Sequence, residues 1–353
     1  MGILPICPRF PFEFAESTVP LTGARLVRAW RMAVSRYARP FEVPREEYPF
    51  KDHWLDLPGG GVFHYVDEGK GVPVVMLHGN PTWSFLYRKV IKELGSSARS
   101  LAPDLPGFGF SRPPAAYGYM PQEHAAVVAA WLDGLKLKEF VLVVQDWGGP
   151  IGMSYAVNNP ERIAGLVILN TWAWEPWLGG RFFSAAMSGM IGRHYILKKN
   201  FFAKKIVPTG IVKEEHKSET VLNAYTDQFP DPDARVPTLI FPWAIRNCGP
   251  WLKSLDAGLA RLAGKPVELV WAMKDPAFGK EMYIDRWLQA FPDAGVTRLP
   301  EASHYLQEDE PEVIAEAIRR VLPVAKRSAR GSQSAKKSTK KVAGKQARAK
   351  KKA

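Results

Sequence analysis

The chain has 353 residues, of which 46% are hydrophobic and 24% are charged. This is the balance of an ordinary globular protein, and it excludes a fully disordered or collagen-like chain. The net charge is +13, but twelve Lys and Arg residues and no Asp or Glu lie between 326 and 352, so the rest of the chain carries about +1. The basic character therefore belongs to a tail and says nothing about an active site.

Both ends of the chain are interpreted as appendages. Residues 1–45 are predicted to be an N-terminal extension, in which five arginines among apolar residues over Leu21–Arg39 are typical of a basic amphipathic helix. Packing on protein, including a homo-oligomer contact, is one interpretation of this helix, and a membrane surface is another. Residues 326–353 lack the apolar side chains of a core, so we expect a disordered basic tail. The alternative for the tail is an arm that binds polyanions weakly.

No apolar run approaches the roughly 20 residues of a membrane-spanning helix, so we expect no integral membrane association. Prolines interrupt residues 1–14, where an export signal would carry its apolar segment. The two cysteines, Cys7 and Cys248, are too few for a disulfide scaffold. A reducing compartment fits this count, so the predicted localisation is cytoplasmic.

Between the appendages, short β-type runs alternate with helical stretches. The strands are expected at 63–69, 73–77, 99–102, 140–144, 163–169, 267–271 and 296–299. The helices are expected at 84–94, 122–135, 149–158, 252–263 and 311–322. Strand–helix alternation of this kind predicts an α/β domain whose mostly parallel central sheet is flanked by helices.

The alternation stops over a segment of about eighty residues that is rich in Trp, Phe, Met and Pro and shows no strand pattern. We therefore expect an inserted helical cap at 172–249, placed over the carboxyl ends of the strands of a main domain at 46–171 and 250–325. Some aromatic and methionine side chains of this insertion are expected to line an apolar pocket, and the others to form the core of the cap.

The most informative motif is VQDWGG, in which Asp146 stands between a strand and a helix and two glycines follow. A strand–nucleophile–helix turn is sharp and lifts its middle side chain above the sheet. A plain helix N-cap is the alternative interpretation of Asp146. The earlier motif HGNPTW also follows a strand. There we interpret His78 as a buried loop histidine, whereas the side-chain NH2 of Asn80 is free to face the same site.

These stretches, together with DLPGFGFS, WAMKD and SHYLQED, make residues 50–322 resemble the α/β-hydrolase superfamily, and specifically the haloalkane dehalogenases. The resemblance implies an α/β-hydrolase fold with a helical cap. It also implies that Asn80 and Trp147 hold a departing halide. The pattern is similar to the subgroup with an Asp–His–Asp triad and an Asn–Trp halide pair.

The chemistry of a carboxylate supports the same interpretation. A carboxylate that attacks a carbonyl forms an anhydride, whereas attack on a saturated carbon forms a stable alkyl ester, so Asp146 suits substitution at saturated carbon. A departing halide needs only polarised N–H donors, which Trp147 and Asn80 supply. The predicted partners are therefore a small halogenated aliphatic substrate, water and a halide ion, with no cofactor and no metal.

The second half-reaction needs a base and an acid that orients it. Among seven histidines only His304 lies after the last predicted strand, as the superfamily order of nucleophile, acid and histidine requires. Asp275 directly follows the strand at 267–271 and is the expected acid, although it would also suit a helix N-cap. The other position for the acid, after the strand that ends at Leu169, holds Asn170, which cannot accept the charge.

Three alternatives are kept. An epoxide hydrolase shares the fold and the Asp nucleophile, and Tyr195 or Tyr225 of the insertion would then donate the proton. A serine esterase is disfavoured because no serine occupies the turn, and Ser154 falls inside the following helix. A non-enzymatic interaction module that works through its basic tail would leave the five site residues without a role.

Overall fold

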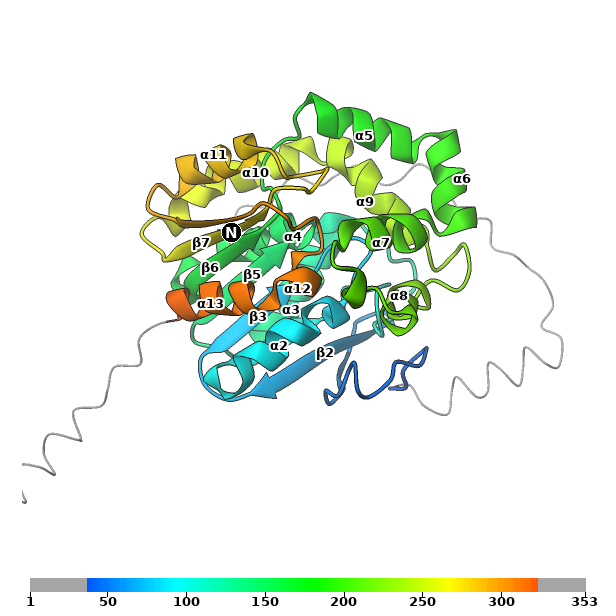
Figure 1. The fold of residues 1–353 in the computed structure, drawn as a ribbon, viewed down its shortest axis with the longest axis horizontal. Helices are drawn as coiled ribbons and strands as arrows, with labels where there is room; N and C mark the ends of the chain where they lie inside the picture. The colour runs from blue at the N-terminus through cyan, green and yellow to red at the C-terminus, as the bar shows by residue number, and fades with distance from the viewer. Residues whose placement is uncertain (1–36, 323–353) are drawn as a thin grey trace, which may run out of the picture. The chain divides into compact units, whose positions relative to one another are not determined.

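The computed structural model describes residues 37–322, which carry the sheet and all labelled helices of Figure 1. The predictions of a basic amphipathic helix at 21–39 and of a disordered tail at 326–353 fall on, or almost wholly on, residues outside this range. No helix of the described part combines the length and the apolar character needed to cross a membrane.

Within residues 37–322 the strands form one sheet in the order β1-β2-β4-β3-β5-β6-β7-β8. β2 pairs antiparallel with both of its neighbours, β1 and β4, and every pair from β4 to β8 is parallel. The strands are β1 (His53–Asp56), β2 (Val62–Gly69), β3 (Pro73–Leu77), β4 (Arg99–Pro103), β5 (Phe140–Gln145), β6 (Ile163–Leu169), β7 (Val267–Ala272) and β8 (Gly295–Leu299). The predicted mostly parallel sheet is confirmed.

Helices cover both faces of the sheet, as Figure 1 shows. On one face α13 packs on β6, β7 and α2, and on the other α4 packs on β5, α3 and α10. These helices and their shorter neighbours are η1 (Ser84–Tyr87), α2 (Arg88–Leu94), η2 (Gly95–Ser97), α3 (Pro121–Gly134), α4 (Gly148–Ala156), η3 (Pro160–Arg162), α10 (Gly249–Gly258), η6 (Leu259–Leu262), α11 (Glu281–Ala290), α12 (Leu306–Asp309) and α13 (Pro311–Val321).

The central strands are apolar along their whole length because both of their faces are covered. Every residue of β5 is buried, and β6 is buried at all but one position. In the register of the sheet, Val144 of β5 lies opposite Leu77 of β3 and Ile168 of β6. These strands therefore end at the same edge, and the loops that follow them meet there.

The chain between β6 and β7 forms helices and no strand, as the sequence predicts. In Figure 1 α5, α6 and α9 lie above the sheet, and α5 packs along α9. The elements of this segment before α10 are α5 (Leu178–Ser188), α6 (Met190–Lys199), η4 (Phe202–Ile206), α7 (Val207–Gly210), η5 (Glu214–His216), α8 (Glu219–Thr226) and α9 (Val236–Asn247).

One strand is missing from the sequence prediction. β1 is a four-residue edge strand with two exposed positions and no apolar alternation, so its sequence carries no strand signal. Its place is set by pairing with β2, in which Trp54 lies opposite His64. Elsewhere the predicted boundaries differ by a few residues, as where the helix expected at 84–94 begins with the 3-10 turn η1.

Candidate active site

Asp146 lies directly between β5 and α4, with a backbone φ of +48°. A positive φ is uncommon outside glycine and here produces the sharp turn that lifts the side chain above the sheet. The turn needs small neighbours. A Cβ atom added to Gly79 would lie 2.3 Å from Oδ1 of Asp146, and one added to Gly148 would lie 2.2 Å from the carbonyl oxygen of Leu77.

The Asp146 carboxyl group is buried and faces backbone donors. The backbone N–H of Asn80 donates to Oδ1 of Asp146 at 2.8 Å, and 9% of the residue is exposed. Burial raises the pKa of Asp146, while the charge of His304 and the N–H groups of Asn80 and Trp147 oppose that rise. One carboxylate oxygen is thus fixed by the backbone, which leaves the other to react.

His304 lies in the loop between β8 and α12, with its ring between two carboxylates. Nδ1 is 2.8 Å from Oδ2 of Asp275, and Nε2 is 3.8 Å from Oδ2 of Asp146. The first contact is a hydrogen bond, and the second is too long for one. Burial lowers the pKa of His304, but the charge and hydrogen bond of Asp275 and the charge of Asp146 outweigh it and raise the pKa above its usual value.

Asp275 follows β7 and is held by a residue to which sequence analysis assigns no positive role. Nδ2 of Asn170 donates to Oδ2 of Asp275 at 2.9 Å, and the backbone N–H of Ala277 donates to Oδ1 at 2.7 Å. Oδ1 of Asn170 accepts the backbone N–H of Ala272 at 2.8 Å. Asn170 thus orients the acid instead of replacing it, and its signal in the sequence is a polar residue at the end of an apolar strand.

Gln145 is a second neighbour that sequence analysis misses. It is buried at the end of β5, and its Nε2 lies 3.1 Å from Nε2 of His304 and 3.1 Å from the carbonyl oxygen of His304. A buried glutamine that closes a strand of five apolar residues is the signal that could have found it. Its two contacts hold the ring and the backbone of His304 together.

Asn80 and Trp147 flank Asp146 and are 8% and 2% exposed. The Trp147 ring stacks on Phe241 of α9, with centroids 5.1 Å apart and 15° between the planes, and meets Trp172 edge-on at 4.8 Å. Within residues 37–322, Oδ1 of Asn80 is buried without a hydrogen-bond partner, so the amide is not fixed at that end. The Asn80 amide and the Trp147 indole each carry an N–H donor beside Asp146.

The structure brings all five predicted site residues to one edge of the sheet. Asn80 follows β3, Asp146 and Trp147 follow β5, Asp275 follows β7, and His304 follows β8. In the part of the chain that the structure describes, no group of three His, Cys, Asp or Glu side chains is arranged to hold a metal ion.

Two residues that sequence analysis sets aside lie where it expects them. His78 is buried, with Nδ1 2.9 Å from the carbonyl oxygen of Gly79 and Nε2 2.9 Å from the backbone N–H of Leu105. Burial lowers the pKa of His78 to about 4, so the ring is neutral and structural. Ser154 lies in α4 and is buried.

The aromatic and methionine side chains of the insertion, expected to line a pocket or form the core of the cap, divide into a buried and an exposed group. Trp172 and Trp174 are buried, and Trp172 touches Trp147. Phe182 and Met190, by contrast, are 66% and 89% exposed. The expectation that these residues line a pocket or form the core is therefore wrong for Phe182 and Met190, because they point out from α5 and α6.

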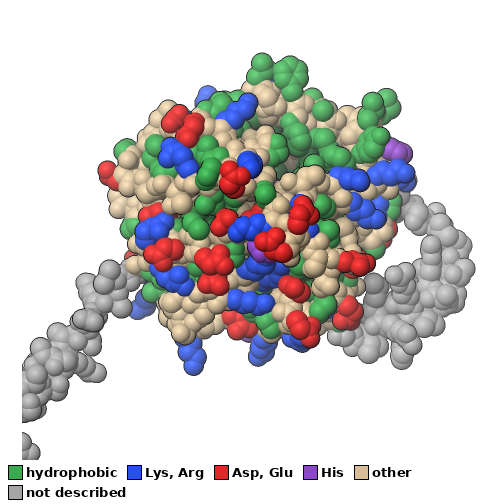
Figure 2. Space-filling model, viewed as in Figure 1, with side chains coloured by type: hydrophobic (Ala, Val, Ile, Leu, Met, Phe, Trp, Pro, Cys, Tyr) green, Lys and Arg blue, Asp and Glu red, His purple; other side chains and the backbone are tan. Residues whose placement is uncertain are grey.

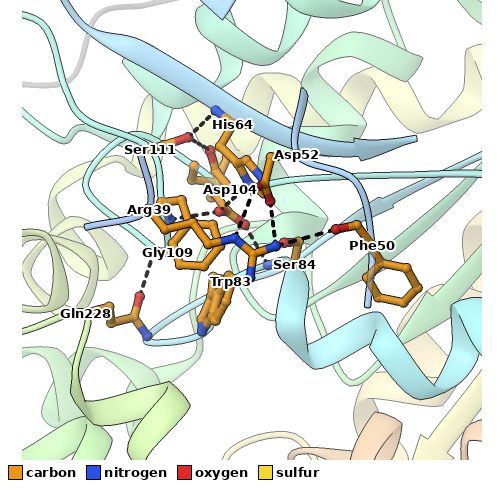
Figure 3. Close-up of polar contacts among 12 residues, drawn as sticks. Arg39, Phe50, Asp52, His64, Trp83, Ser84, Asp104, Gly109, Ser111 and Gln228 are labelled. Atoms are coloured by element: carbon orange, nitrogen blue, oxygen red, sulfur yellow. Dashed lines mark hydrogen bonds and ion pairs between the residues drawn. The ribbon is translucent and has the colours of Figure 1, made fainter. Parts of the chain in front are cut away.

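A second buried histidine lies between two carboxylates (Figure 3). His64 on β2 has Nδ1 2.8 Å from Oδ2 of Asp104 and Nε2 3.2 Å from Oδ1 of Asp52. Asp104 also accepts the backbone N–H groups of Ser84 at 2.8 Å and Phe110 at 2.9 Å. Asp104 begins the motif DLPGFGFS, which is therefore anchored by this cluster.

Comparison with known proteins agrees with the fold. The family model described as alpha/beta hydrolase fold matches residues 72–311. Haloalkane dehalogenase 2 of Mycobacterium bovis is 42% identical over 273 residues, which are 77% of this chain and 94% of the relative. Cis-3-alkyl-4-alkyloxetan-2-one decarboxylase of Shewanella oneidensis is 35% identical over 280 residues, 74% of this chain and 85% of the relative.

Among solved structures, haloalkane dehalogenase DbeA from Bradyrhizobium elkani superposes with a TM-score of 0.69 at 26% identity, covering 77% of this chain and 98% of that one. The class of protein is thus the α/β-hydrolase fold, here with an aspartate in the turn between β5 and α4. Within that class, the chain belongs to the haloalkane dehalogenase family.

Proposed function

We propose that the protein hydrolyses haloalkanes to an alcohol, a halide ion and a proton. The observation that carries this proposal is the geometry of Asp146. One of its oxygens accepts the backbone N–H of Asn80 at 2.8 Å, and the other lies 3.8 Å from Nε2 of His304. A nucleophilic carboxylate with a base beside it suits substitution followed by ester hydrolysis.

In the first step, Oδ2 of Asp146 attacks the carbon that carries the halogen. A C–O bond forms, the carbon–halogen bond breaks, and the halide leaves with the electron pair. The indole N–H of Trp147 and the side-chain NH2 of Asn80 stabilise the charge that develops on the halide. Stacking of Trp147 on Phe241 keeps its N–H in place.

In the second step, Nε2 of His304 takes a proton from water, whose oxygen attacks the carboxyl carbon of the alkylated Asp146. The backbone N–H groups of Asn80 and Trp147 stabilise the oxyanion of the tetrahedral intermediate. Collapse of this intermediate releases the alcohol and restores the carboxylate, and one proton passes to solvent. Asp275 stabilises the imidazolium and fixes its orientation.

Halide release from a short terminal bromoalkane tests the assignment. We expect steady release by the wild type and none by Asp146→Asn, because an amide does not displace the halide. His304→Ala should release one bromide per enzyme and then stop, with the mass of a trapped alkyl ester on Asp146. Steady bromide release by Asp146→Asn would overturn the mechanism.

The halide pair is tested by Trp147→Phe, which removes the N–H and keeps an aromatic ring to stack on Phe241. Loss of the N–H donor that stabilises the charge developing on the halide should lower kcat by about 10²- to 10³-fold. Chloride inhibition should weaken in parallel, which is measured in the same bromide assay. Phe241→Leu serves as a comparison, since it weakens the stack but keeps the indole N–H group, and kcat should fall less than in Trp147→Phe. An unchanged kcat in Trp147→Phe would remove Trp147 from the halide site.

The same assay distinguishes haloalkane hydrolysis from epoxide hydrolysis and from oxetanone decarboxylation. For an epoxide hydrolase the proton donors would be Tyr195, which is 51% exposed, and Tyr225, whose hydroxyl already donates to Glu308. The relative named as an oxetanone decarboxylase motivates a second control substrate, a cis-3,4-dialkyl-oxetan-2-one. Turnover of an epoxide or of the oxetanone without bromide release would replace the dehalogenase assignment.

We also propose that residues 172–249 act as a cap over Asp146. Three contacts of this segment with the site region support the proposal: Phe241 stacks on Trp147, the indole N–H of Trp83 donates to the carbonyl oxygen of Ala224 at 2.9 Å, and Nε2 of Gln228 donates to that of Pro81 at 3.0 Å. Enlarging the pocket with Phe241→Ala should shift the preference toward longer bromoalkanes, as read from kcat/KM.

The remaining expectations stay proposals with simple tests. Cys248 is buried and is not a free thiol in the structure. This counts against the reducing compartment on which the predicted cytoplasmic localisation rests. Cell fractionation tests the localisation. Self-association through Leu21–Arg39 is measured by light scattering. Weak polyanion binding by the tail at 326–353 is measured as salt-dependent retention on DNA, with and without the tail.

A further inference from the structure

The outer side of α5 and α6 exposes the most accessible large apolar side chains of residues 37–322. Met190 is 89% exposed, Ile191 76%, Leu178 69% and Phe182 66%, and Phe183 beside them is 46% exposed. In Figure 2 hydrophobic groups gather over α5 and the start of α6, at the top and upper right of the view. Several large exposed apolar side chains gathered over two successive helices in this way mark an interaction site.

The same stretch of chain is basic and contains no acid. Residues 176–213 hold seven Lys and Arg residues and neither Asp nor Glu. Four of these lysines are exposed where α6 ends and η4 follows, and none of the four forms an ion pair within the described residues: Lys198, Lys199, Lys204 and Lys205. Figure 2 shows basic side chains below the apolar group on the right of the view.

The apolar side chains stand on a firmly packed helix. The inner face of α5 packs on α9, and Oγ of the buried Ser184 donates to the carbonyl oxygen of Pro242 at 2.6 Å. The outward direction of Phe182 is therefore set by the packing of α5 on α9. Because α9 also carries Phe241 against Trp147, one helix layer separates the exposed face from the candidate active site.

We propose that this face binds the surface of a bilayer that contains anionic lipid. The α5–α6 surface is defined here by its apolar part, Leu178, Phe182, Phe183, Met190 and Ile191, and its basic part, Lys198, Lys199, Lys204 and Lys205. The apolar side chains enter the boundary between head groups and acyl chains, and the lysines lie over the phosphate groups.

The charges of the α5–α6 surface favour an anionic bilayer over a second copy of the chain or a nucleic acid. Two copies of the chain meeting face to face through this surface would bring their lysines together without any acid from 176–213 to pair with them. A nucleic acid would attract the lysines but would leave Leu178, Met190 and Ile191 in water. Only a negatively charged surface with an apolar layer beneath it satisfies both parts.

A hollow of about 1340 Å³ extends the basic part of the surface. Its lining includes Lys199, Lys204, Lys205 and Arg235, together with one acid, Asp227. A lipid phosphate placed there would meet several cations at once. Haloalkanes concentrate in apolar phases, so an enzyme on a bilayer would meet more substrate, but the binding itself does not depend on the proposed function.

The test is sedimentation of the full-length chain with vesicles of pure phosphatidylcholine and with vesicles that contain 30% phosphatidylglycerol. We expect binding to the anionic vesicles and little to the neutral ones. Phe182→Ser with Ile191→Ser should weaken binding to anionic vesicles at least tenfold, because two apolar side chains are lost from the bilayer boundary. Lys204→Gln with Lys205→Gln should weaken it about 25-fold, at roughly fivefold for each charge.

The controls account for the basic tail, which every variant keeps. Met282→Ser removes an apolar side chain of α11 that is 40% exposed, and Lys136→Gln with Lys138→Gln removes two exposed lysines that precede β5, at the other end of the sheet from Asp146. Each control should bind within twofold of the wild type. All variants should keep the wild-type rate of bromide release in vesicle-free buffer, so that loss of binding is distinguished from loss of folding or activity.

Three results would overturn the proposal. The first is equal binding of the wild type to neutral and anionic vesicles, or none to either. The second is wild-type binding by both α5–α6 double variants, which would assign the vesicle contact to the tail. The third is light scattering in which Phe182→Ser with Ile191→Ser converts an oligomer to a monomer, which would make a second copy the occupant.

Discussion

Two buried histidines of this protein each lie between two aspartates, and the two clusters differ in one contact. At His64 both ring nitrogens lie within hydrogen-bond distance of a carboxylate, 2.8 Å from Asp104 and 3.2 Å from Asp52. At His304 one nitrogen is bonded to Asp275 at 2.8 Å, while the other is 3.8 Å from Asp146. In the first cluster, the closed one, a carboxylate is bonded to each ring nitrogen. In the second, the open one, Nε2 has no carboxylate within hydrogen-bond distance, and the neutral amide of Gln145 lies 3.1 Å from it. We expect this nitrogen to be the one that acts on a reactant.

The surroundings of the carboxylates explain the difference. Asp104 is saturated by two backbone N–H groups, and Asp52 receives two bonds from Arg39 at 2.9 Å (Figure 3). Burial opposes ionisation of Asp52, but hydrogen bonds from His64 and Arg39 and their charges hold its pKa well below the usual value. Asp146 instead has its pKa raised by burial. We therefore expect the same triplet of residue types to serve stability in one place and reactivity in the other.

The largest expected effect comes from Asp275→Asn in the open cluster. Loss of this charge removes the stabilisation of the His304 imidazolium. It also removes the preference for the tautomer that carries its proton on Nδ1 and leaves Nε2 unprotonated. We expect kcat for bromide release to fall about 10³- to 10⁴-fold. The alkyl ester on Asp146 should accumulate, as seen by mass spectrometry of the quenched reaction. A kcat within tenfold of the wild type would show that Asp275 is not the acid.

The same substitution in the closed cluster, Asp104→Asn, should act on stability. Removing one partner of a buried ion pair leaves the charge of His64 undercompensated and should cost about 3 kcal/mol in the free energy of unfolding, measured in urea. At temperatures well below the melting transition, kcat should change less than threefold. If kcat falls as far as in Asp275→Asn, the distinction between the clusters fails.

The pH dependence of activity and of stability should run in opposite directions. The pKa values of His64 and His304 are both raised, against burial, by their aspartates. His304 must be neutral to activate water, so kcat should fall about tenfold per pH unit below its raised pKa. The stabilisation from each protonated histidine is complete below the unfolded value near 6.5 and is lost as pH rises through the folded pKa.

Measurement of kcat and of the free energy of unfolding between pH 5.5 and 9 checks this. The alkaline loss of stability should shrink in His64→Gln, while the pH at which kcat reaches half of its maximum stays unchanged. A shift of that midpoint in His64→Gln would mean that the two histidines are coupled.

Much of the molecule is determined by local sequence. Continuous apolar runs such as Phe140–Gln145 predict parallel strands because a strand covered on both faces has no polar side to show. The turn around Asp146 is predictable because its glycines stand where a side chain would collide with the neighbouring strand or carboxylate. The order of nucleophile, acid and histidine along the chain, with the position of Asp275 at a strand end, predicts Asp275 and His304, and the structure places their side chains 2.8 Å apart.

Tertiary structure decided what no local pattern encodes. Asn170 and Asp275 are 105 residues apart, and only the pairing of β6 with β7 brings the amide onto the carboxylate. Phe182 and Trp172 are both aromatic residues of one segment, yet Phe182 is exposed on α5, whose inner face packs on α9, and Trp172 is buried just after β6 and touches Trp147. Residue type determines which chemistry is available, and long-range packing determines which side chains can reach one another to perform it.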